Sequence, residues 1–255
     1  MDNLKVAAQL YTIRDYTKTV KDIKSSLKKV ADIGYSAVQV SGMGPIEPET
    51  LKSIVDDLGL TICATHIPFE RMEEDIDSVI REHKLWACKY VGIGSMPSEY
   101  RGTLEGVKKF AKKASTIGKL LSENGLRLIY HNHAFEFSKL GGRTIMDILF
   151  EETDEDFDFE LDTYWIQVGG GNPVDWIYRV EGRMDVVHFK DMVGNLDNSH
   201  KMTEVGEGNL NWSAIIKACQ DTGVKWCAVE RDICERSPFD SLEISLNNLK
   251  RFGLE

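Results

Sequence analysis

Short apolar runs and longer helical patterns alternate eight times along the 255 residues of this chain. The expected strands cover residues 6–10, 37–40, 60–64, 90–93, 126–131, 157–162, 185–189 and 225–230. The segments between them carry apolar residues at helical spacing, as Val20, Ile23, Leu27 and Val30 do before the stop signal of Gly34. Strands joined through helices must run parallel, so the alternation predicts a parallel sheet covered by helices.

This alternation of eight strands and eight helices within about 250 residues is the count of a (β/α)8 or TIM barrel. We therefore predict an α/β fold in which residues 1–255 form a single TIM-barrel domain. The rival architecture is a doubly wound open sheet, which usually has a Gly-rich phosphate turn after its first strand. Here Leu10 is followed by Tyr-Thr-Ile-Arg, which favours the barrel.

Charge and composition restrict the partners of the chain. A net charge of −10 argues against nucleic acid and against anionic membranes. No run approaches the roughly 18 apolar residues of a membrane span, and the start Met1–Lys5 lacks a basic-then-apolar leader. The five cysteines are odd in number and show no Cys-x-x-Cys spacing, which favours reduced thiols. We therefore expect a cytoplasmic protein acting on a small molecule, with the oligomeric state open, a homo-oligomer included.

Chemically capable side chains gather at the strand ends, where the active site of a TIM barrel lies. They are Gln9, Gln39, His66, His131, His133, Glu136, Asp162, His188, Lys190, Asp191, Glu230 and Asp232. Among them His131, Asp162, His188 and Glu230 each end one of four consecutive strands, so they could meet around one cation. Two imidazoles and two carboxylates suit Mn²⁺, Co²⁺, Zn²⁺ or Fe²⁺ better than Ca²⁺. Such an ion would leave positions open to polarise a substrate hydroxyl and carbonyl.

Plainer interpretations exist for each of these residues. A lone histidine near a strand end, such as His66, is more often a hydrogen-bonded structural residue than a ligand. Asp162 could cap the turn that follows its strand, and Glu230 could pair with Arg231 or Lys190. What favours the metal site is that the last four strands all end in ligand-type residues.

Lys190 and Glu136 also have two interpretations each. Lys190 shares the side-chain parity of His188, so it could reach the barrel mouth and bind a sugar oxygen or an enolate. It could instead form a salt bridge with Asp191 or Asp162. Glu136 could abstract a proton α to a carbonyl, or it could pair with a nearby basic residue such as Lys139.

Several other features can be explained by structure alone, without a functional role. The aromatic rings in loops after the strands, Trp165 among them, suit stacking against a sugar face, although packing explains any single one. The lone Gly206-x-Gly208 is best explained by a turn that leads to a helix with Asn211 as its N-cap. His83 and His200 are expected to be solvated; the first lies within a helical pattern and the second within a polar segment.

Six segments, taken together and in order, resemble a known family. They are residues 9–14 (Gln-Leu-Tyr-Thr-Ile-Arg), 130–137 (Tyr-His-Asn-His-Ala-Phe-Glu-Phe), 161–165 (Leu-Asp-Thr-Tyr-Trp), 188–191 (His-Phe-Lys-Asp), 206–208 (Gly-Glu-Gly) and 230–232 (Glu-Arg-Asp). They are similar to the xylose isomerase-like TIM barrels, specifically the sugar phosphate isomerase/epimerase group that also includes inosose dehydratases and endonuclease IV-type repair enzymes.

The resemblance implies a divalent metal held by Glu, Asp, His and Glu at the ends of strands five to eight. Asp162, His188 and Glu230 match the last three ligands, whereas His131 stands where the family commonly has the first glutamate. In the epimerases that glutamate is both a ligand and an acid/base residue. The Tyr-His-x-His of strand five is instead similar to the inosose dehydratase-like branch, and Trp165 stands where several epimerases carry a substrate-binding histidine.

We therefore expect an enzyme of carbohydrate metabolism, a metal-dependent sugar or sugar phosphate isomerase/epimerase that abstracts a proton α to a metal-polarised carbonyl. The first alternative is a dehydratase or lyase on a keto-sugar or keto-cyclitol, and the second is a non-catalytic sugar-binding barrel. A DNA phosphodiesterase is disfavoured because no basic groove is evident. The expected cofactor is one divalent metal (Mn, Co, Zn, Fe or Mg). The expected roles are metal binding by His131, Asp162, His188 and Glu230, acid/base chemistry by Glu136, His133 and Glu230, and substrate binding by His66, Lys190 and Trp165.

Overall fold

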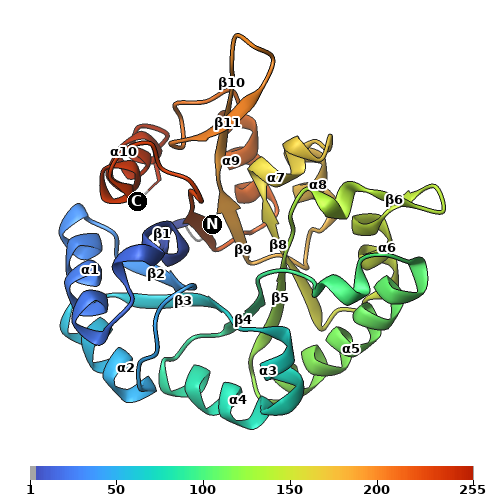
Figure 1. The fold of residues 1–255 in the computed structure, drawn as a ribbon, viewed down its shortest axis with the longest axis horizontal. Helices are drawn as coiled ribbons and strands as arrows, with labels where there is room; N and C mark the ends of the chain where they lie inside the picture. Colours follow the sequence, from blue (N-terminus) through green and yellow to red (C-terminus); the bar gives the residue numbers. More distant parts are fainter. Residues whose placement is uncertain (1–3, 255) are drawn as a thin grey trace.

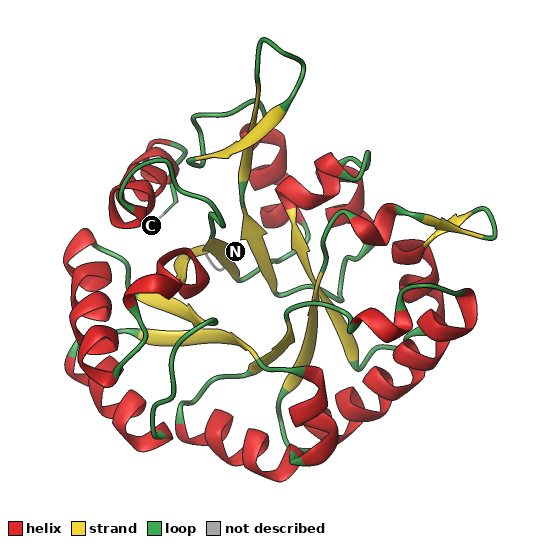
Figure 2. Ribbon diagram, viewed as in Figure 1, coloured by secondary structure: helices red, strands yellow, loops and turns green. Residues whose placement is uncertain are grey.

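Eight parallel strands close into a barrel in the computed structural model, which describes residues 4–254 (Figures 1 and 2). The barrel strands are β1 (Lys5–Gln9), β2 (Ala37–Val40), β3 (Thr61–His66), β4 (Tyr90–Ile93), β5 (Arg127–His131), β8 (Phe157–Asp162), β9 (Val186–Phe189) and β12 (Trp226–Val229). β1 pairs with β2 on one side and with β12 on the other, which closes the sheet. The predicted (β/α)8 fold is confirmed, and the open-sheet alternative is wrong. Residues 1–3, on which the expected lack of a leader partly rests, lie outside the described range.

Helices surround the barrel, and their ends follow local sequence signals (Figure 2). They are α1 (Val20–Ile33), α2 (Pro48–Asp57), α3 (Phe69–Glu74), α4 (Ile76–Leu85), α5 (Leu104–Glu123), α6 (Ile145–Glu152), α7 (Thr163–Val168), α8 (Pro173–Arg179), α9 (Trp212–Asp221) and α10 (Pro238–Arg251). Thr19 and Asp22 form a reciprocal capping box at the start of α1, and Gly34 ends that helix with a φ of +113°. Asn211 caps α9, as its sequence position predicts.

Three parts of the chain differ from the expected pattern. The segment between β3 and β4, where a helical pattern was expected, forms two helices, because Asp75 has a non-helical φ of −147° and its side chain caps α4. The residues after Asp162 form the short helix α7 rather than an open turn. Two hairpins stand where no strand was expected, β6 (Lys139–Leu140) with β7 (Arg143–Thr144) and β10 (Asp191–Gly194) with β11 (His200–Thr203). The β10–β11 hairpin projects from the rim of the barrel (Figure 1).

The interior of the barrel is apolar towards the N-terminal ends of the strands, the lower layer, and polar towards their C-terminal ends. The lower layer is a small cluster that includes Ala7, Ala37, Ile129, Val186 and Ala228. The residues two positions further along these strands are Gln9, Gln39, His131, His188 and Glu230. Side chains two residues apart share a face of a strand, and the hydrogen bond from Gln39 to Glu160 joins β2 to β8 across the interior. Strand parity therefore carries polar side chains to the C-terminal mouth.

No covalent cross-link supports this architecture among the described residues. All five cysteines are free, and Cys63, Cys88, Cys219 and Cys227 are buried. A larger apolar cluster, distinct from the one inside the barrel, includes residues of the strands and of the surrounding helices. Within residues 4–254, no helix has the length and apolar character needed to cross a membrane.

Candidate active site

Four ligand-type side chains converge at the mouth of the barrel. His131, Asp162, His188 and Glu230 come from β5, β8, β9 and the end of β12, which are neighbouring strands. One nitrogen or oxygen from each lies within 4.8 Å of those of the other three, and all four residues are buried. These are the four residues expected to meet from their places at the strand ends, and the structure brings them together.

The hydrogen bonds of the two imidazoles fit a bound cation. The outer nitrogen of His131, Nδ1, lies 3.0 Å from the carbonyl oxygen of Gly94, to which it can only donate. The Nε2 of His188 lies 2.8 Å from Oε1 of Gln39, and that oxygen is free to accept because the Gln39 amide nitrogen donates to Glu160. When each ring keeps a proton on its outer nitrogen, its inner nitrogen can offer a lone pair to a metal ion, which is how hydrogen-bond partners prepare metal-ligating histidines.

These inner nitrogens face carboxylate oxygens rather than hydrogen-bond donors. His131 Nε2 lies 3.2 Å from Asp162 Oδ2, and His188 Nδ1 lies 3.1 Å from Glu230 Oε2. Acceptors packed this closely need a positive charge between them. Burial lowers the pKa of His188, but Glu160 and Glu230 outweigh it and raise the pKa to about 10. A proton and a divalent cation are thus alternative partners for this nitrogen.

Asp162 caps a helix and also takes part in the cluster of four residues, so both interpretations of its sequence position hold. Its Oδ1 accepts a hydrogen bond of 2.9 Å from the backbone N–H of Trp165 and so caps α7. Its Oδ2 faces His131 and lies 3.1 Å from the Lys190 ammonium. Burial raises the pKa of this carboxyl group, but Lys190 and the neighbouring imidazoles hold it below its usual value.

Lys190 is a buried lysine surrounded by three carboxylates. Its Nζ lies 2.7 Å from Glu230 Oε2, 3.1 Å from Asp162 Oδ2, and 3.1 and 3.2 Å from the two oxygens of Asp232. Burial lowers the pKa of Lys190, yet these carboxylates raise it above its ordinary value, so the group is an ammonium at neutral pH. Of the two salt bridges considered for Lys190, the one with Asp162 forms and the one with Asp191 does not, and the side chain also reaches the cavity wall.

Glu160, which was not predicted from the sequence, lies one layer below the four converging residues. Its Oε2 is 2.5 Å from Nε2 of His66, and its Oε1 is 3.3 Å from Nε2 of His188. Burial opposes ionisation, but His188 and His66 lower the pKa of Glu160, so the carboxylate is charged. The alternation of β8, which places Glu160 on the same face as Asp162, was the signal that could have found it.

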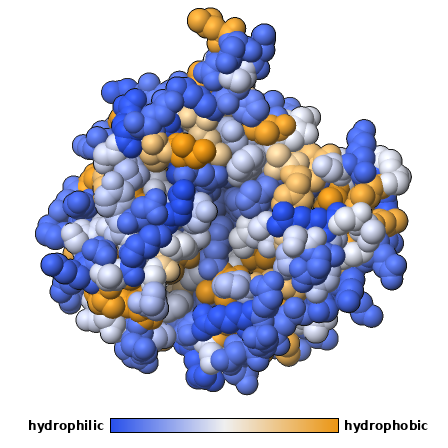
Figure 3. Space-filling view, viewed as in Figure 1, coloured by the Kyte–Doolittle hydropathy of each residue, from blue (hydrophilic) through white to orange (hydrophobic). Residues whose placement is uncertain are grey.

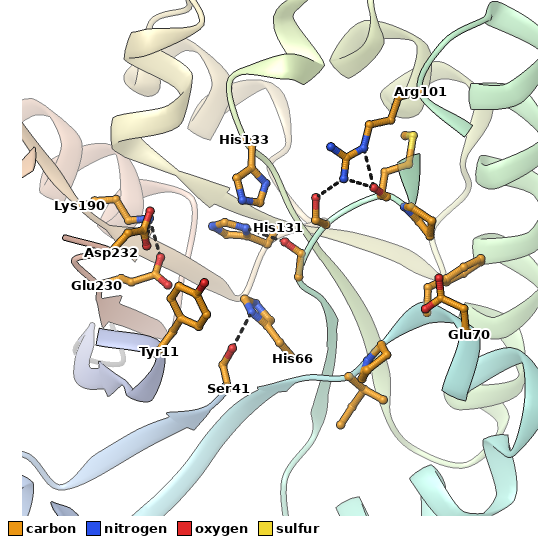
Figure 4. A pocket seen from close by; sticks show the side chains of 17 residues that line it. Tyr11, Ser41, His66, Glu70, Arg101, His131, His133, Lys190, Glu230 and Asp232 are labelled. Atoms are coloured by element: carbon orange, nitrogen blue, oxygen red, sulfur yellow. Dashed lines mark hydrogen bonds and ion pairs between the residues drawn. The ribbon is translucent and has the colours of Figure 1, made fainter. Parts of the chain in front are cut away.

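A cavity of about 520 Å³ lies over this cluster. Its wall includes His66, His131, His133, Lys190, Glu230 and Asp232. Figure 4 shows Lys190, Asp232 and Glu230 grouped at one side and His66, His131 and His133 beside them. The face drawn in Figure 3 is hollowed near its centre, above the barrel mouth. The volume suits a small molecule, because ligand pockets measure roughly 300–1,000 Å³.

His133 and Trp165 lie side by side, but only His133 reaches the cavity wall. Their ring centroids are 5.5 Å apart, and the Trp165 ring also lies 5.4 Å from the Lys190 ammonium. Burial, with help from His131 and Lys190, lowers the pKa of His133 to about 3, which leaves its ring neutral. The substrate contact predicted for Trp165 does not fit this position, because the indole packs behind His133 and Lys190.

Glu136 lies away from the cavity, so the predicted acid/base role does not fit its place. The side chain is fully buried. Its Oε1 accepts a hydrogen bond of 2.6 Å from the Tyr130 hydroxyl, and its Oε2 accepts one of 2.8 Å from the backbone N–H of His133. Burial raises the pKa of Glu136 to about 8. Tyr130 and His131 are adjacent and point to opposite faces of β5, so Glu136 packs on the outer side of the barrel and supports the turn that carries His133.

Asp191 also has a structural position rather than a chemical one. Its carboxylate accepts hydrogen bonds from the backbone N–H groups of Gly206 (2.9 Å) and Gly208 (3.0 Å) and from the indole N–H of Trp212 (2.6 Å). These bonds hold together the two ends of the long segment between β9 and α9, which contains β10 and β11. They also explain the Gly-x-Gly sequence, since Gly206 has a φ of +86° and a Cβ on Gly208 would overlap the Asp191 carboxylate.

Comparison with known proteins gives the same architecture. A family profile described as the xylose isomerase-like TIM barrel matches residues 27–251. The rhizopine catabolism protein MocC of Rhizobium meliloti is 22% identical, over 91% of this chain and 82% of its own length. An inosose dehydratase of Klebsiella pneumoniae subsp. pneumoniae is 25% identical, over 84% of each chain.

Solved structures agree on the fold. A sugar phosphate isomerase/epimerase from Parabacteroides distasonis superposes with a TM-score of 0.79 at 22% identity, over 98% of this chain and 94% of its own. A structure of L-ribulose 3-epimerase has a TM-score of 0.72 at 14% identity, over 97% of this chain and 94% of its own. At these identities the likeness concerns the barrel and not the reaction.

Proposed function

This chain belongs to the xylose isomerase-like TIM barrel family, and on that premise we propose that it is a divalent-metal-dependent carbon–oxygen lyase acting on a keto-sugar or keto-cyclitol. The observation that carries the proposal is the convergence of His131, Asp162, His188 and Glu230 beside a cavity lined by further imidazoles and an ammonium. In the proposed reaction a base removes the proton α to the carbonyl, and the β C–O bond then breaks. A C=C bond forms, and the departing oxygen takes up a proton and leaves as water or an alcohol.

The four converging residues would hold the cation. Both imidazoles already have their outer nitrogens tied to fixed hydrogen-bond partners, so their inner nitrogens are free to ligate. When bound, a divalent ion polarises a substrate carbonyl and hydroxyl as a Lewis acid. Mn²⁺, Co²⁺, Zn²⁺, Fe²⁺ and Mg²⁺ remain the candidate ions, with the mixed nitrogen and oxygen donors favouring the transition metals.

His66 is the proposed proton acceptor. Its Nε2 lies 2.5 Å from the buried Glu160 carboxylate, which fixes the proton on that nitrogen and leaves Nδ1 as the acceptor. Nδ1 lies on the side of Ser41, 3.4 Å from its hydroxyl, and both residues are part of the cavity wall. A buried carboxylate that orients an imidazole and stabilises the imidazolium is the arrangement used by acid–base dyads in hydrolases.

Lys190 would stabilise the charge that develops on the substrate oxygen. Its ammonium is part of the cavity wall and lies beside Glu230 and Asp232 (Figure 4). A preorganised cation in a buried site acts most strongly where negative charge appears during the reaction. This assignment keeps Lys190 as a substrate contact, as the sequence predicted.

Elimination is favoured over epimerisation by the residue at the end of β5. His131 has its Nδ1 proton committed to Gly94 and its Nε2 turned towards Asp162, so it is not available to move substrate protons as a glutamate would be. Isomerisation or epimerisation is the second candidate. It is supported by His66 and His133, two imidazoles in the cavity wall that could serve opposite faces of a sugar.

Product analysis in D₂O tests the proposal. The protein would be incubated with Mn²⁺ and a panel of ketoses, 3-keto-glycosides and inososes, and the products followed by mass spectrometry and NMR. We expect a product that has lost water or an alcohol. A product of unchanged composition that carries deuterium at the α carbon would instead establish the isomerase or epimerase.

The His66→Gln variant provides the matching residue test. We expect a fall in kcat of about 10²–10⁴-fold, the usual contribution of a general base, while His200→Gln, which changes an exposed histidine of β11, keeps full activity. Binding of these sugars without α-proton exchange or product would contradict both enzymatic candidates and leave a sugar-binding barrel.

A further inference from the structure

The Lys190 ammonium contacts the same two carboxylate oxygens that face the inner ring nitrogens of His131 and His188. Glu230 Oε2 lies 2.7 Å from Lys190 Nζ and 3.1 Å from His188 Nδ1. Asp162 Oδ2 lies 3.1 Å from Lys190 Nζ and 3.2 Å from His131 Nε2. A divalent cation held by these oxygens would have a buried like charge as its immediate neighbour, where water screens little.

Asp232 is a third carboxylate that pairs with the Lys190 ammonium. Both of its oxygens lie within 3.2 Å of Lys190 Nζ, and no imidazole of the cluster pairs with them. Its side chain is 23% exposed and lines the cavity, whereas Asp162 and Glu230 are buried. Arg14 donates a hydrogen bond of 2.9 Å to the Asp232 backbone carbonyl and so holds this carboxylate at the rim.

The backbone of Lys190 is fixed, which limits any movement to its side chain. Its N–H donates to Thr163 Oγ1 at 3.1 Å, and the Thr163 hydroxyl donates to the Lys190 carbonyl at 2.8 Å. The long flexible stem of lysine can therefore redistribute its ammonium among three carboxylates while the strand end stays in place.

We propose that Lys190 and Asp232 form a charge gate on the metal centre. The ammonium neutralises Asp162 and Glu230 until a divalent cation takes them, and Asp232 then receives the ammonium at the cavity wall, where the substrate meets it. The order of assembly is therefore metal first and substrate second. This inference rests on the proposed metal site, and it assigns to Asp232 a positioning role that acts through Lys190.

Mn²⁺ titrations of the full chain test the gate without measuring turnover. Isothermal calorimetry, or the electron paramagnetic resonance signal of free Mn²⁺, would give the Kd for wild type, Lys190→Met, Asp232→Asn and the double variant. We expect Lys190→Met to bind Mn²⁺ at least tenfold more tightly and Asp232→Asn about tenfold more weakly. In the Lys190→Met background, Asp232→Asn should change the Kd by less than about threefold.

The matched controls remove the same charges from an exposed ion pair. Lys201 and Glu235 pair at 2.8 Å outside the cavity, and Lys201→Met and Glu235→Gln should leave the Mn²⁺ Kd unchanged. Lys190→Gln, which keeps a polar group in the buried position, replaces Lys190→Met if circular dichroism shows that the methionine variant is unfolded.

Each other result has a defined meaning. If Asp232→Asn weakens Mn²⁺ binding equally with and without Lys190, Asp232 acts as a direct charge and the gate is refuted. If Lys190→Met weakens binding, the ammonium supports the metal rather than competing with it, and the gate is refuted as well. Both results leave the metal site standing. Absence of Mn²⁺, Co²⁺ and Zn²⁺ binding in wild type and in all variants would overturn the metal site and the gate together.

Discussion

Asp162 shows how single residues join local structure to the site. One carboxylate oxygen caps α7 and the other faces the cluster, so the start of the helix and the position of the ligand-type oxygen fix each other. Glu160 has the same double character one layer below, where it orients His66 and His188 at once. Buried polar networks of this kind hold only when every member is satisfied.

His83 is a buried residue whose charge should control stability in acid. It was expected to be solvated, but it is buried, with Nε2 2.7 Å from the Thr65 hydroxyl and Nδ1 2.7 Å from the Val79 carbonyl. Burial lowers its pKa from 6.5 to about 4. The folded protein therefore resists protonating His83 while the unfolded chain accepts the proton, so stability falls as the pH drops from about 6.5 to about 4.

We expect the stability difference between wild type and His83→Gln to shrink by up to about 3 kcal/mol between pH 7 and pH 4, since glutamine does not titrate. Urea unfolding at several pH values measures it. His200→Gln, a change at an exposed histidine, should show a difference that does not vary with pH. A constant difference for His83→Gln as well would show that His83 titrates normally.

The candidate site was partly readable from the sequence, and the limits have physical causes. His131, Asp162, His188 and Glu230 could be grouped because each ends a strand, and parallel strand ends converge in a barrel. Glu136 could not be placed, because its direction depends on the tight 3₁₀ turn Phe135–Phe137 and on the partner hydroxyl of Tyr130. Such turn geometry depends on tertiary contacts rather than on local residue types.

At the scale of elements, the close packing of helices on strands limits the size of the side chains that fit between them. Gly118 lies in the middle of α5, and a Cβ there would overlap the carbonyl oxygen of Asp156 just before β8. The α5 helix therefore approaches the barrel more closely than any larger residue would allow. A glycine inside a helix normally weakens it by about 1 kcal/mol relative to alanine, and here the close approach explains its presence.

Gly118→Ala should accordingly destabilise the protein by about 1–3 kcal/mol, the usual cost of overpacking, despite the better helix propensity of alanine. Chemical denaturation measures the change. Thr116→Ala, on the exposed face of the same helix, is the control and should be neutral or slightly stabilising. Stabilisation by Gly118→Ala would mean that α5 can move away from the barrel at little cost.

The elements themselves followed from the sequence more fully than the site did. The strands Ala37–Val40, Tyr90–Ile93 and Phe157–Asp162 have their predicted bounds, because each is a short apolar run set off by clear boundaries in the sequence. The β10–β11 hairpin was not predicted, since its two strands are only four residues long each and depend on Asp191 at their base. Helix α7 was missed because its cap is also a site residue.

At the scale of the whole molecule, the apolar residues that stabilise the barrel and the polar residues of the candidate site lie in different layers. Apolar side chains fill the lower interior and the space beneath the helices, while the polar layer lies at the mouth. Three buried carboxylates, Glu160, Asp162 and Glu230, meet there with the partly exposed Asp232, and the Lys190 ammonium pairs with Asp162, Glu230 and Asp232. The mouth is thus where a bound cation would add most to the stability of the fold.

Adding Mn²⁺ at about a hundred times its Kd should stabilise the protein by about 2.7 kcal/mol, which raises Tm by roughly 5–10 °C for a chain of this size. Differential scanning fluorimetry with and without Mn²⁺ measures the shift, and a chelator should reverse it. Glu230→Gln, which removes one proposed ligand, should abolish most of the shift. An equal shift in that variant would place the Mn²⁺ elsewhere on the molecule.

The Asp191 carboxylate has a consequence for how this protein can diverge. By tying Gly206, Gly208 and Trp212 to the end of β9, it closes this long segment at its base, and the β10–β11 hairpin forms a sheet separate from the barrel. Insertions or deletions near the exposed tip around Leu196 would then alter the rim without disturbing the strands that carry the ligands. Evolution can therefore vary the length of this hairpin while inheriting the chemistry of the barrel mouth unchanged.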